Sequence, residues 1–411
     1  MKKLLICLFV LALICLSLAA CGNKGEVKTL YVYNWGEYIS DGSDGSLDVN
    51  AAFEKWYEET YGERVEVNYS TFSSNEDMYT KLSSGATKYD IIVPSDYMIE
   101  RMISEDMLRP LDFSNIPNIE NVDYAALFGA EGNYYDADNA YSVPYTYGTV
   151  GIIYNTTIVD AADVGSWELM WNEKYQGNVL QFNNSRDAFA TALYALGYSV
   201  NTTNEAEWLE ALEKLKAQKD VVQGYVMDEV FNKMKNGSAA IAPYYAGDFF
   251  TMYADNQDLA FFYPAERKTN IFVDAMCIPK GSQNPLIAER YINFMLREDI
   301  GVANAEYMCY ASPNKLVKQN AGYIETMQDI HPDALNILYG NDPHHFEAYQ
   351  NLSDEQLTLL NSLWEDLKIE STVGGAIIVS AAVIAAACVT GGILLYVKRR
   401  KRRRIVADLW K

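Results

Sequence analysis

Histidine is scarce in this chain of 411 residues, which contains only three. His331, His344 and His345 lack the spacing of a zinc-binding helix or a zinc finger, so we predict no metal site. The chain also lacks the glycine-rich loop that cradles phosphates and the Gly-x-Ser-x-Gly elbow of many hydrolases. The sequence does not exclude a catalytic Ser–His–acid triad whose residues lie far apart in the chain. No motif indicates catalysis, however, and we predict neither a cofactor nor an enzymatic activity.

Cysteine is also rare, with six residues in the whole chain. Residues 22–372 contain only Cys277 and Cys309. Outside the cell these two could form a disulfide, but two separate thiols are equally compatible with the sequence. Internal repeats and low-complexity tracts are absent, which argues against a repeat protein.

The N-terminus has the layout of an export signal. Two lysines precede an apolar run over 4–18, and the run ends in Ala19-Ala20-Cys21. This ending resembles the bacterial lipoprotein signal, in which the cysteine becomes the lipid-bearing first residue after cleavage. We therefore predict a lipoprotein signal peptide over 1–20, lipidation of Cys21 and a polar tether over 21–27; the alternative is an ordinary signal peptide with an incidental cysteine.

The C-terminus contains a second long apolar run. Residues 373–397 carry no charge, and seven consecutive basic residues follow at 398–404. The run exceeds the roughly 20 residues that cross a bilayer, and the basic cluster favours a cytoplasmic end. We predict a transmembrane helix over 373–397 and a basic cytoplasmic tail over 398–411, so the preceding residues would lie on the extracellular (periplasmic) face of the cell membrane. The alternative is a buried core helix.

Acidic residues outnumber basic ones by 55 to 33, which gives a formal net charge of −22. Ten of the basic residues and one acidic residue lie outside residues 22–372, so this segment carries a net charge of about −31. Such a balance argues against nucleic acid and anionic substrates as ligands, and it favours cations through long-range attraction. Acidic surfaces also keep proteins soluble, and that simpler explanation stays open.

Residues 22–372 are long enough for two lobes with substantial cores. The hydrophobic pattern alternates strands and helices, which is typical of a parallel α/β sheet. Strands over 147–154 and 271–279 are predicted to cross between the lobes, since Pro144 and Gly148 mark a change of direction. The other main predicted elements are strands over 28–33, 64–69, 89–94, 179–182, 239–243 and 258–262, and helices over 47–61, 74–83, 185–196, 205–218, 284–297 and 299–307, with a closing helix to about 367.

Acids and aromatic residues recur together where predicted strands and helices end or begin. Ring faces and carboxylates both attract organic cations, and open α/β sheets bind ligands beyond the ends of their strands. The alternative is structural: Ser95 and Asp96 are good helix caps, and Asn184 with Asp187 makes a capping-box-like start. The stretches concerned are Trp35-Gly36-Glu37-Tyr38, Ser95-Asp96-Tyr97, Tyr244–Asp248 and Phe272-Val273-Asp274.

The order of these stretches resembles the bacterial spermidine/putrescine-binding proteins, the extracellular receptors of polyamine ABC importers. The resemblance implies an α/β, two-lobed periplasmic-binding-protein fold (type II) with a hinge and a central cleft. It places one lobe at 28–145 and 275–315, and the other at 146–274 and 316–370. The motifs that carry it are Tyr33–Tyr38, Ser73–Tyr79, Asp90–Ser95, Tyr244–Asp248, Asp274–Pro279 and Ala311–Asn314.

The same resemblance implies a set of ligand-binding residues. It makes Asp187 and Asp274 acids for ligand amines, and it puts Glu37 near one amine. Asn184 stands where spermidine-type members have Asp, and Asp248 matches an acid of putrescine-preferring relatives, so the length of the ligand stays open. The full set is Trp35, Glu37, Tyr38, Ser95, Tyr97, Asn184, Asp187, Tyr245, Asp248, Phe272, Asp274 and Tyr310.

We therefore predict a substrate-binding component that captures putrescine or spermidine and delivers it to ABC permease subunits with a cytoplasmic ATPase. Attachment to the membrane would use the lipid anchor and the C-terminal helix. A membrane-anchored sensor or adhesion module with the same fold is the alternative, and a surface hydrolase is a third reading without supporting residues. Within the binding class, an iron or aminophosphonate receptor would share the fold, but the acids and rings speak against both.

Overall fold

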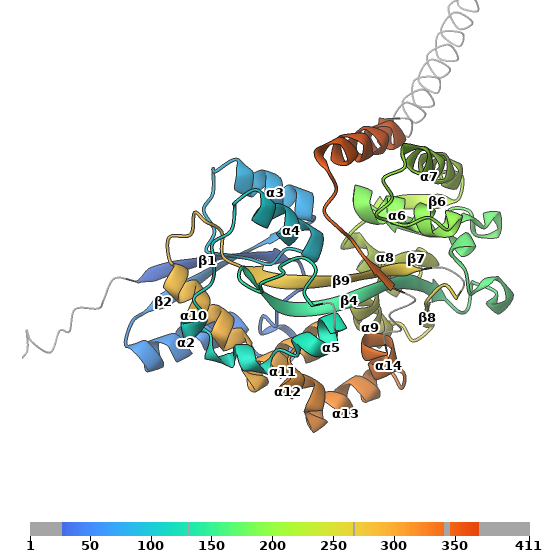
Figure 1. Ribbon diagram of the computed structural model, residues 1–411. Coiled ribbons are helices and arrows are strands. Elements are labelled where there is room, and N and C mark those ends of the chain that lie inside the picture. The colour runs from blue at the N-terminus through green and yellow to red at the C-terminus, as the bar shows by residue number, and fades with distance from the viewer. Residues whose placement is uncertain (1–26, 130–131, 266–267, 341–345, 370–411) are drawn as a thin grey trace, which may run out of the picture.

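The computed structural model describes residues 27–129, 132–265, 268–340 and 346–369. Its main strands follow the order β2-β1-β3-β9-β4-β7-β5-β6, with β8 paired to β4 and β10 paired to β9. Helices gather in two lobes around the two halves of this path, and β4 and β9 run between the lobes (Figure 1). The chain is thus built as two α/β lobes that share crossing strands.

The first lobe begins with the predicted alternation of strands and helices. β1 (Lys28–Trp35) pairs in parallel with β2 (Val65–Phe72) on one side and with β3 (Ile91–Ile92) on the other. The connections are α2 (Val49–Tyr61) and α3 (Asn75–Ser83). Each element overlaps its predicted range, so the sequence pattern was sufficient here.

Helices cover both faces of this half of the sheet, with α3 and α4 on one face and α2 and α10 on the other (Figure 1). Phe53 of α2 is fully buried, and its ring centroid lies 4.9 Å from that of Tyr291 and 5.5 Å from that of Phe294, both on α10. The remaining helices of this part are α4 (Asp96–Ser104), α5 (Tyr124–Phe128), α10 (Pro285–Met295), α11 (Glu298–Met308) and α12 (Lys315–Gln319), with 3-10 turns η2 (Phe113–Asn115) and η3 (Pro117–Asn121).

Two antiparallel strands connect the lobes. β4 (Ser142–Asn155) pairs along its first half with β9 (Thr269–Cys277) and along its second half with β7 and β8. The register shifts between Pro144 and Thr146, next to the predicted change of direction. Because β4 and β9 run through both lobes without a break, the predicted boundaries at 145/146 and 274/275 stay a prediction.

The second lobe completes the sheet. The predicted ranges 179–182, 185–196 and 205–218 match β5, α6 and α7, whereas β6, α8 and α9 were not predicted. Its elements are β5 (Val179–Phe182), α6 (Ser185–Leu196), α7 (Glu205–Gln218), β6 (Val222–Val226), α8 (Glu229–Lys235), β7 (Ile241–Tyr245), α9 (Ala246–Asp255) and β8 (Leu259–Phe262), with 3-10 turns η5 (Ala161–Asp163), η6 (Trp167–Trp171) and η7 (Glu173–Tyr175).

The last part of the chain returns to the second lobe. After α13 (Ala321–Ile330) and α14 (Ala334–Tyr339), β10 (Phe346–Ala348) pairs with the start of β9. A helix over 354–369 then lies beside α7 (Figure 1), and its buried leucines share one apolar cluster with α6 and α7. Its predicted capping box, Ser353 with Gln356, is confirmed by reciprocal side-chain bonds of 3.3 and 3.1 Å to the backbone N–H groups.

The predicted architecture needs one correction. Across the described ranges, no helix is long and apolar enough to cross a bilayer, so a transmembrane helix is withdrawn from the fold assignment. The predicted span at 373–397 and the tail at 398–411 lie outside the described residues, as do the signal peptide and Cys21. Cys277 and Cys309 are both buried free thiols, which decides the alternative that the sequence left open.

Candidate ligand-binding site

A cavity lies between the lobes and is partly open to solvent; its empty volume, including the part that opens to solvent, is about 820 Å³. Side chains line it from the loop after β1, the starts of α4, α6 and α9, and from β9. The structure brings together all of the residues that the family resemblance implied, and their role in binding stays a prediction. Those in the lining are Trp35, Glu37, Tyr38, Ser95, Tyr97, Asn184, Asp187, Tyr245, Asp248, Phe272, Asp274 and Tyr310.

The loop after β1 is shaped by its own side chains. The Oδ1 of Asn34 accepts a bond of 2.8 Å from the N–H of Trp35, and its Nδ2 donates to the carbonyl of Tyr38 at 3.3 Å. Glu37 has a φ of 52°, in the left-handed region that side chains other than glycine and asparagine seldom adopt. Backbone strain of this kind persists where the surroundings impose it, and it concentrates at ligand sites.

Asp274 lies deep in the cavity, with 3% of its surface exposed. Its carboxylate accepts hydrogen bonds from the hydroxyls of Ser95, at 2.6 Å, and Tyr38, at 2.7 Å. Burial raises the pKa of Asp274 to about 6, although both hydrogen bonds act to lower it. Ser95 occupies the N-cap position of α4 but makes no capping bond, because its hydroxyl is turned to Asp274.

Asp187 is the second buried acid of the cavity and belongs to the other lobe. It accepts bonds from the hydroxyls of Tyr245 (2.6 Å) and Tyr349 (2.8 Å) and from the Nδ2 of Asn184 (2.8 Å). The Oδ1 of Asn184 accepts from the N–H of Asp187 at 2.7 Å, so the capping interpretation of Asn184 is correct as well. An amide at position 184 can donate to Asp187, which a second carboxylate could not do.

Arg186 is a buried cation in this acidic cavity, and the sequence interpretation missed it. It is 5% exposed, and its guanidinium carbon lies 4.7 Å from the ring centroid of Tyr349 and 5.3 Å from that of Tyr97. Glu76 lies close by and accepts a bond of 2.9 Å from the hydroxyl of Tyr97. Burial raises the pKa of Glu76, and the charge of Arg186 opposes that rise.

Asp248 stands in the first turn of α9 and is 9% exposed. Burial raises the pKa of Asp248 to about 8 against the lowering effect of a hydrogen bond from Tyr310, and the charges of Asp228 and Glu37 raise it further. Asp248 is therefore mostly protonated near neutral pH. A bound cation would favour its ionised form and displace the proton.

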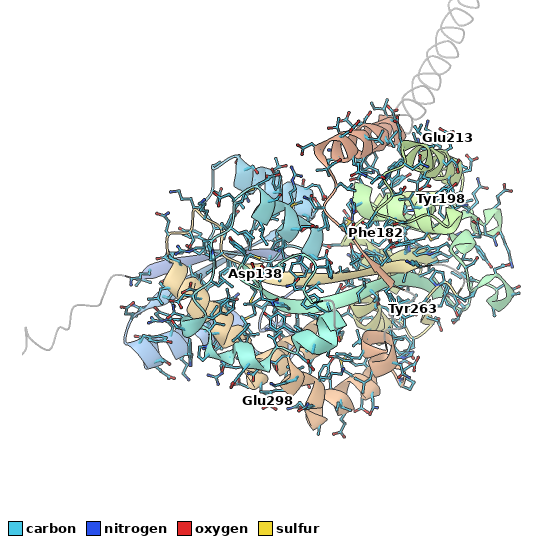
Figure 2. The ribbon with its side chains drawn as sticks, viewed as in Figure 1. Asp138, Phe182, Tyr198, Glu213, Tyr263 and Glu298 are labelled. Carbon is cyan, nitrogen blue, oxygen red and sulfur yellow. The ribbon has the colours of Figure 1, made fainter. Side chains whose placement is uncertain are left out.

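Aromatic rings form the walls between the acids. The ring of Tyr38 packs edge-on against Tyr310, with centroids 5.0 Å apart, and Tyr245 packs in the same way against Phe272 at 5.4 Å. Phe182, which is labelled toward the middle of the molecule in Figure 2, packs against Tyr245 with the ring centroids 5.4 Å apart. These rings offer apolar surface to a methylene chain and negative faces to its charged ends.

Two glycines make room for these rings. A Cβ on Gly247 would lie 2.4 Å from the ring of Tyr310, and one on Gly148 would lie 2.7 Å from the ring of Phe272. The sequence interpretation treated Gly148 as a sign of a change in chain direction. Gly148 instead lies inside β4, where the absence of a side chain lets the ring of Phe272 approach the backbone closely.

Several lining residues escaped the sequence analysis, in particular Glu76, Arg186, Asp228 and Tyr349. Glu76 lies within one of the motifs behind the family resemblance, so a role could have been assigned to it. Arg186 stands directly before Asp187 at a predicted helix start, which is the available signal for it. Nothing in the local pattern marks Asp228 or Tyr349, because both reach the cavity only through the packing of segments that lie far apart in the chain.

Sequence comparisons agree with this geometry. Residues 51–329 match the family model described as bacterial extracellular solute-binding protein. The spermidine/putrescine-binding periplasmic protein of Salmonella typhimurium is 31% identical over 78% of this chain and 88% of its own length.

Solved structures are similar over nearly their whole length. A Listeria monocytogenes protein assigned to a spermidine/putrescine ABC transporter is 33% identical, with a TM-score of 0.72, over 84% of this chain and 99% of that one. The Tp0655 (TpPotD) lipoprotein of Treponema pallidum is 25% identical, with a TM-score of 0.66, over 83% of this chain and 99% of that one. The predicted two-lobed periplasmic-binding fold and the family resemblance are thereby confirmed. This chain belongs to the bacterial extracellular solute-binding proteins, in the family of the spermidine/putrescine-binding periplasmic proteins.

Proposed function

We propose that this chain is the substrate-binding component of a polyamine ABC importer, and that it captures putrescine or spermidine in the cavity between its lobes. The observation that carries the proposal is the environment of Asp274. Its carboxylate is held by two hydroxyls, and the charges shown to act on it within the described part of the chain are those of other acids, Asp187 and Asp96. A buried acid without a cation is costly, so a ligand ammonium is the partner that this site is suited to bind.

The rest of the cavity suits the same ligand. Asp187 supplies a second buried acid on the opposite lobe, and the rings between the two acids suit a chain of methylene groups. An aminophosphonate would bring negative charge next to these acids, and an iron receptor would gain little from the aromatic walls. The relatives named for spermidine and putrescine support a polyamine over both.

Transport is the role that the relatives support, since the Listeria protein is assigned to an ABC transporter. We propose that the chain delivers its ligand to permease subunits that work with a cytoplasmic ATPase. The curated relative is periplasmic, and the Treponema relative is a lipoprotein. We propose an extracytoplasmic location here too, with cleavage of the signal peptide and lipid attachment at Cys21.

Calorimetric titration tests the proposal directly. We expect one molecule of putrescine or spermidine to bind per protein. The matched control is 1,4-butanediol, which has the four-carbon chain of putrescine but no charge, and we expect it to give no binding heat. Absence of binding with both polyamines, or equal binding of the diol, would refute the proposed function.

A further inference from the structure

Two residues from opposite lobes meet at one edge of the cavity. Gly36 lies in the loop after β1, and Asp228 stands directly before α8. A Cβ on Gly36 would come within 2.9 Å of the Oδ2 of Asp228. The backbone of Gly36 lies outside the left-handed region, so its conformation does not require glycine. The missing side chain is what leaves space for the carboxylate of Asp228. We call this meeting point of Gly36 and Asp228 the mouth of the cavity.

A second hollow begins at the mouth. This outer groove has an empty volume of about 1220 Å³, is more open to solvent, and shares Gly36, Glu37, Tyr38 and Asp228 with the cavity. Further acids continue along it, namely Asp41, Asp48 and Glu54. A linear cation that filled the cavity could therefore extend past Gly36 into surroundings that are still acidic.

The side chain of Asp228 has no evident structural role at the start of α8. It occupies the N-cap position of α8, yet its side chain makes no capping hydrogen bond. Its charge acts instead on the cavity, where it raises the pKa of Asp248 together with Glu37. An acid that approaches the opposite lobe, next to two further acids, gains most from a cation placed between them.

We propose that Asp228 is a specificity-determining residue, which binds the third ammonium group of a linear triamine at the mouth of the cavity. This inference rests on the proposed polyamine-binding function, and it says which residue distinguishes a triamine such as spermidine from a diamine such as putrescine. Asp187 and Asp274 serve the two ammonium groups that diamines and triamines share. Gly36 contributes to this subsite, because a side chain at position 36 would displace the carboxylate of Asp228 from the mouth.

The test compares spermidine with putrescine in calorimetric titrations of the full chain and its Asp228→Asn variant. We expect the Kd for spermidine to rise about tenfold and the Kd for putrescine to change by less than about twofold. Asp228→Glu should keep most of the preference for spermidine. Gly36→Ala should lower it in part, because the new methyl group pushes the carboxylate of Asp228 aside.

The matched control is Asp220→Asn, which makes the same substitution at another acid of the same lobe. Asp220 is exposed and lines neither hollow, so the ratio of the two affinities should stay as in the unchanged protein. Equal losses for both ligands in Asp228→Asn, no loss at all, or an equal change of ratio in Asp220→Asn would overturn the inference. Polyamine binding by the unchanged protein would still support the proposed function in those cases, whereas its absence would refute both.

Discussion

The buried acids at the two ends of the cavity, Asp274 and Asp187, have different surroundings. Asp274 accepts two hydroxyl bonds, and the nearby charge that acts on it is negative. Asp187 accepts three hydrogen bonds, and its end of the cavity also holds the buried cation Arg186, whose charge acts on a further acid, Glu76. An acid with several donors is largely stabilised by the protein, whereas an acid with fewer donors and no cation is not. The Asp274 end therefore depends on the ligand for its charge balance, and the Asp187 end is mostly formed in advance.

The largest expected effect is that of Asp274→Asn on binding. Loss of a buried, charge-assisted contact should weaken putrescine binding by about 100-fold, measured by calorimetry. Asp41→Asn is the matched control, because Asp41 is exposed and lies outside the cavity. Its affinity should stay within about twofold of the unchanged protein. Equal affinities of the two variants would remove Asp274 from the binding site.

Acid pH should weaken putrescine binding, because two buried acids of the cavity, Asp248 and Asp274, then become protonated. Burial raises the pKa of Asp248 to about 8 and that of Asp274 to about 6. A bound ammonium favours the ionised forms, so binding near pH 7 should release protons. Affinity for putrescine should fall about tenfold from pH 8 to pH 6.5, where Asp248 takes up its proton. Titrations in two buffers with different ionisation enthalpies measure the released protons, and a result of none, with constant affinity, would contradict this account.

Asp187→Asn should weaken putrescine binding less, by about tenfold, because three donors of the protein already hold the carboxylate of Asp187. It should also lower the free energy of unfolding of the ligand-free protein by about 1–3 kcal/mol, since three donors lose a charged acceptor. Thermal or denaturant unfolding without ligand measures the second effect. A larger loss of binding than in Asp274→Asn would reverse the proposed order of the two ends.

Asp274→Asn should have the opposite effect on stability. The folded-state pKa of Asp274 is raised, so ionisation of this acid destabilises the fold as the pH rises from about 4 to about 6, and the full effect is present above that range. At pH 8 the substitution should therefore increase the free energy of unfolding by about 2–3 kcal/mol. At pH 4 the difference should disappear, which serves as the internal control.

The smallest expected effect separates the ring of Tyr245 from its hydroxyl. Tyr245→Phe keeps the aromatic wall but removes one of the three bonds to Asp187. We expect a loss of affinity of about threefold, whereas Tyr245→Leu, which removes the ring, should lose about tenfold. A Phe variant as weak as the Leu variant would show that the hydrogen bond to Asp187 matters more than the ring.

Much of the fold follows from local pattern. The ranges 179–182, 185–196 and 205–218 were predicted to the residue because strong periodicity and clear caps mark them. Asp274 was predicted at a ligand site because it follows an aromatic residue in one of the acid-and-aromatic stretches and falls on an acid position in the family resemblance, and it does line the cavity. The helix α9 was missed because Tyr244–Asp248 reads as the end of a strand, although the helix begins within it.

What local pattern could not supply is the pairing of residues that lie far apart in the chain. Tyr349 donates a hydrogen bond to Asp187, 162 residues away in the sequence, and Asp228 meets Gly36 from the opposite lobe. Ser95 was read both as a helix cap and as a ligand residue, and only its bond to Asp274 shows that it does not cap. Long-range pairing of this kind depends on tertiary packing, which strand and helix periods do not encode.

A crystal structure of the protein with a bound polyamine would show directly which carboxylates hold the ammonium groups. We expect the ligand in the cavity between the lobes, with one ammonium nitrogen about 2.8 Å from the carboxylate of Asp274 and a second near Asp187. The methylene chain should lie against the rings of Tyr245, Phe272 and Tyr310. A ligand bound elsewhere, or one whose ammonium groups leave Asp274 without a cation, would contradict the claim.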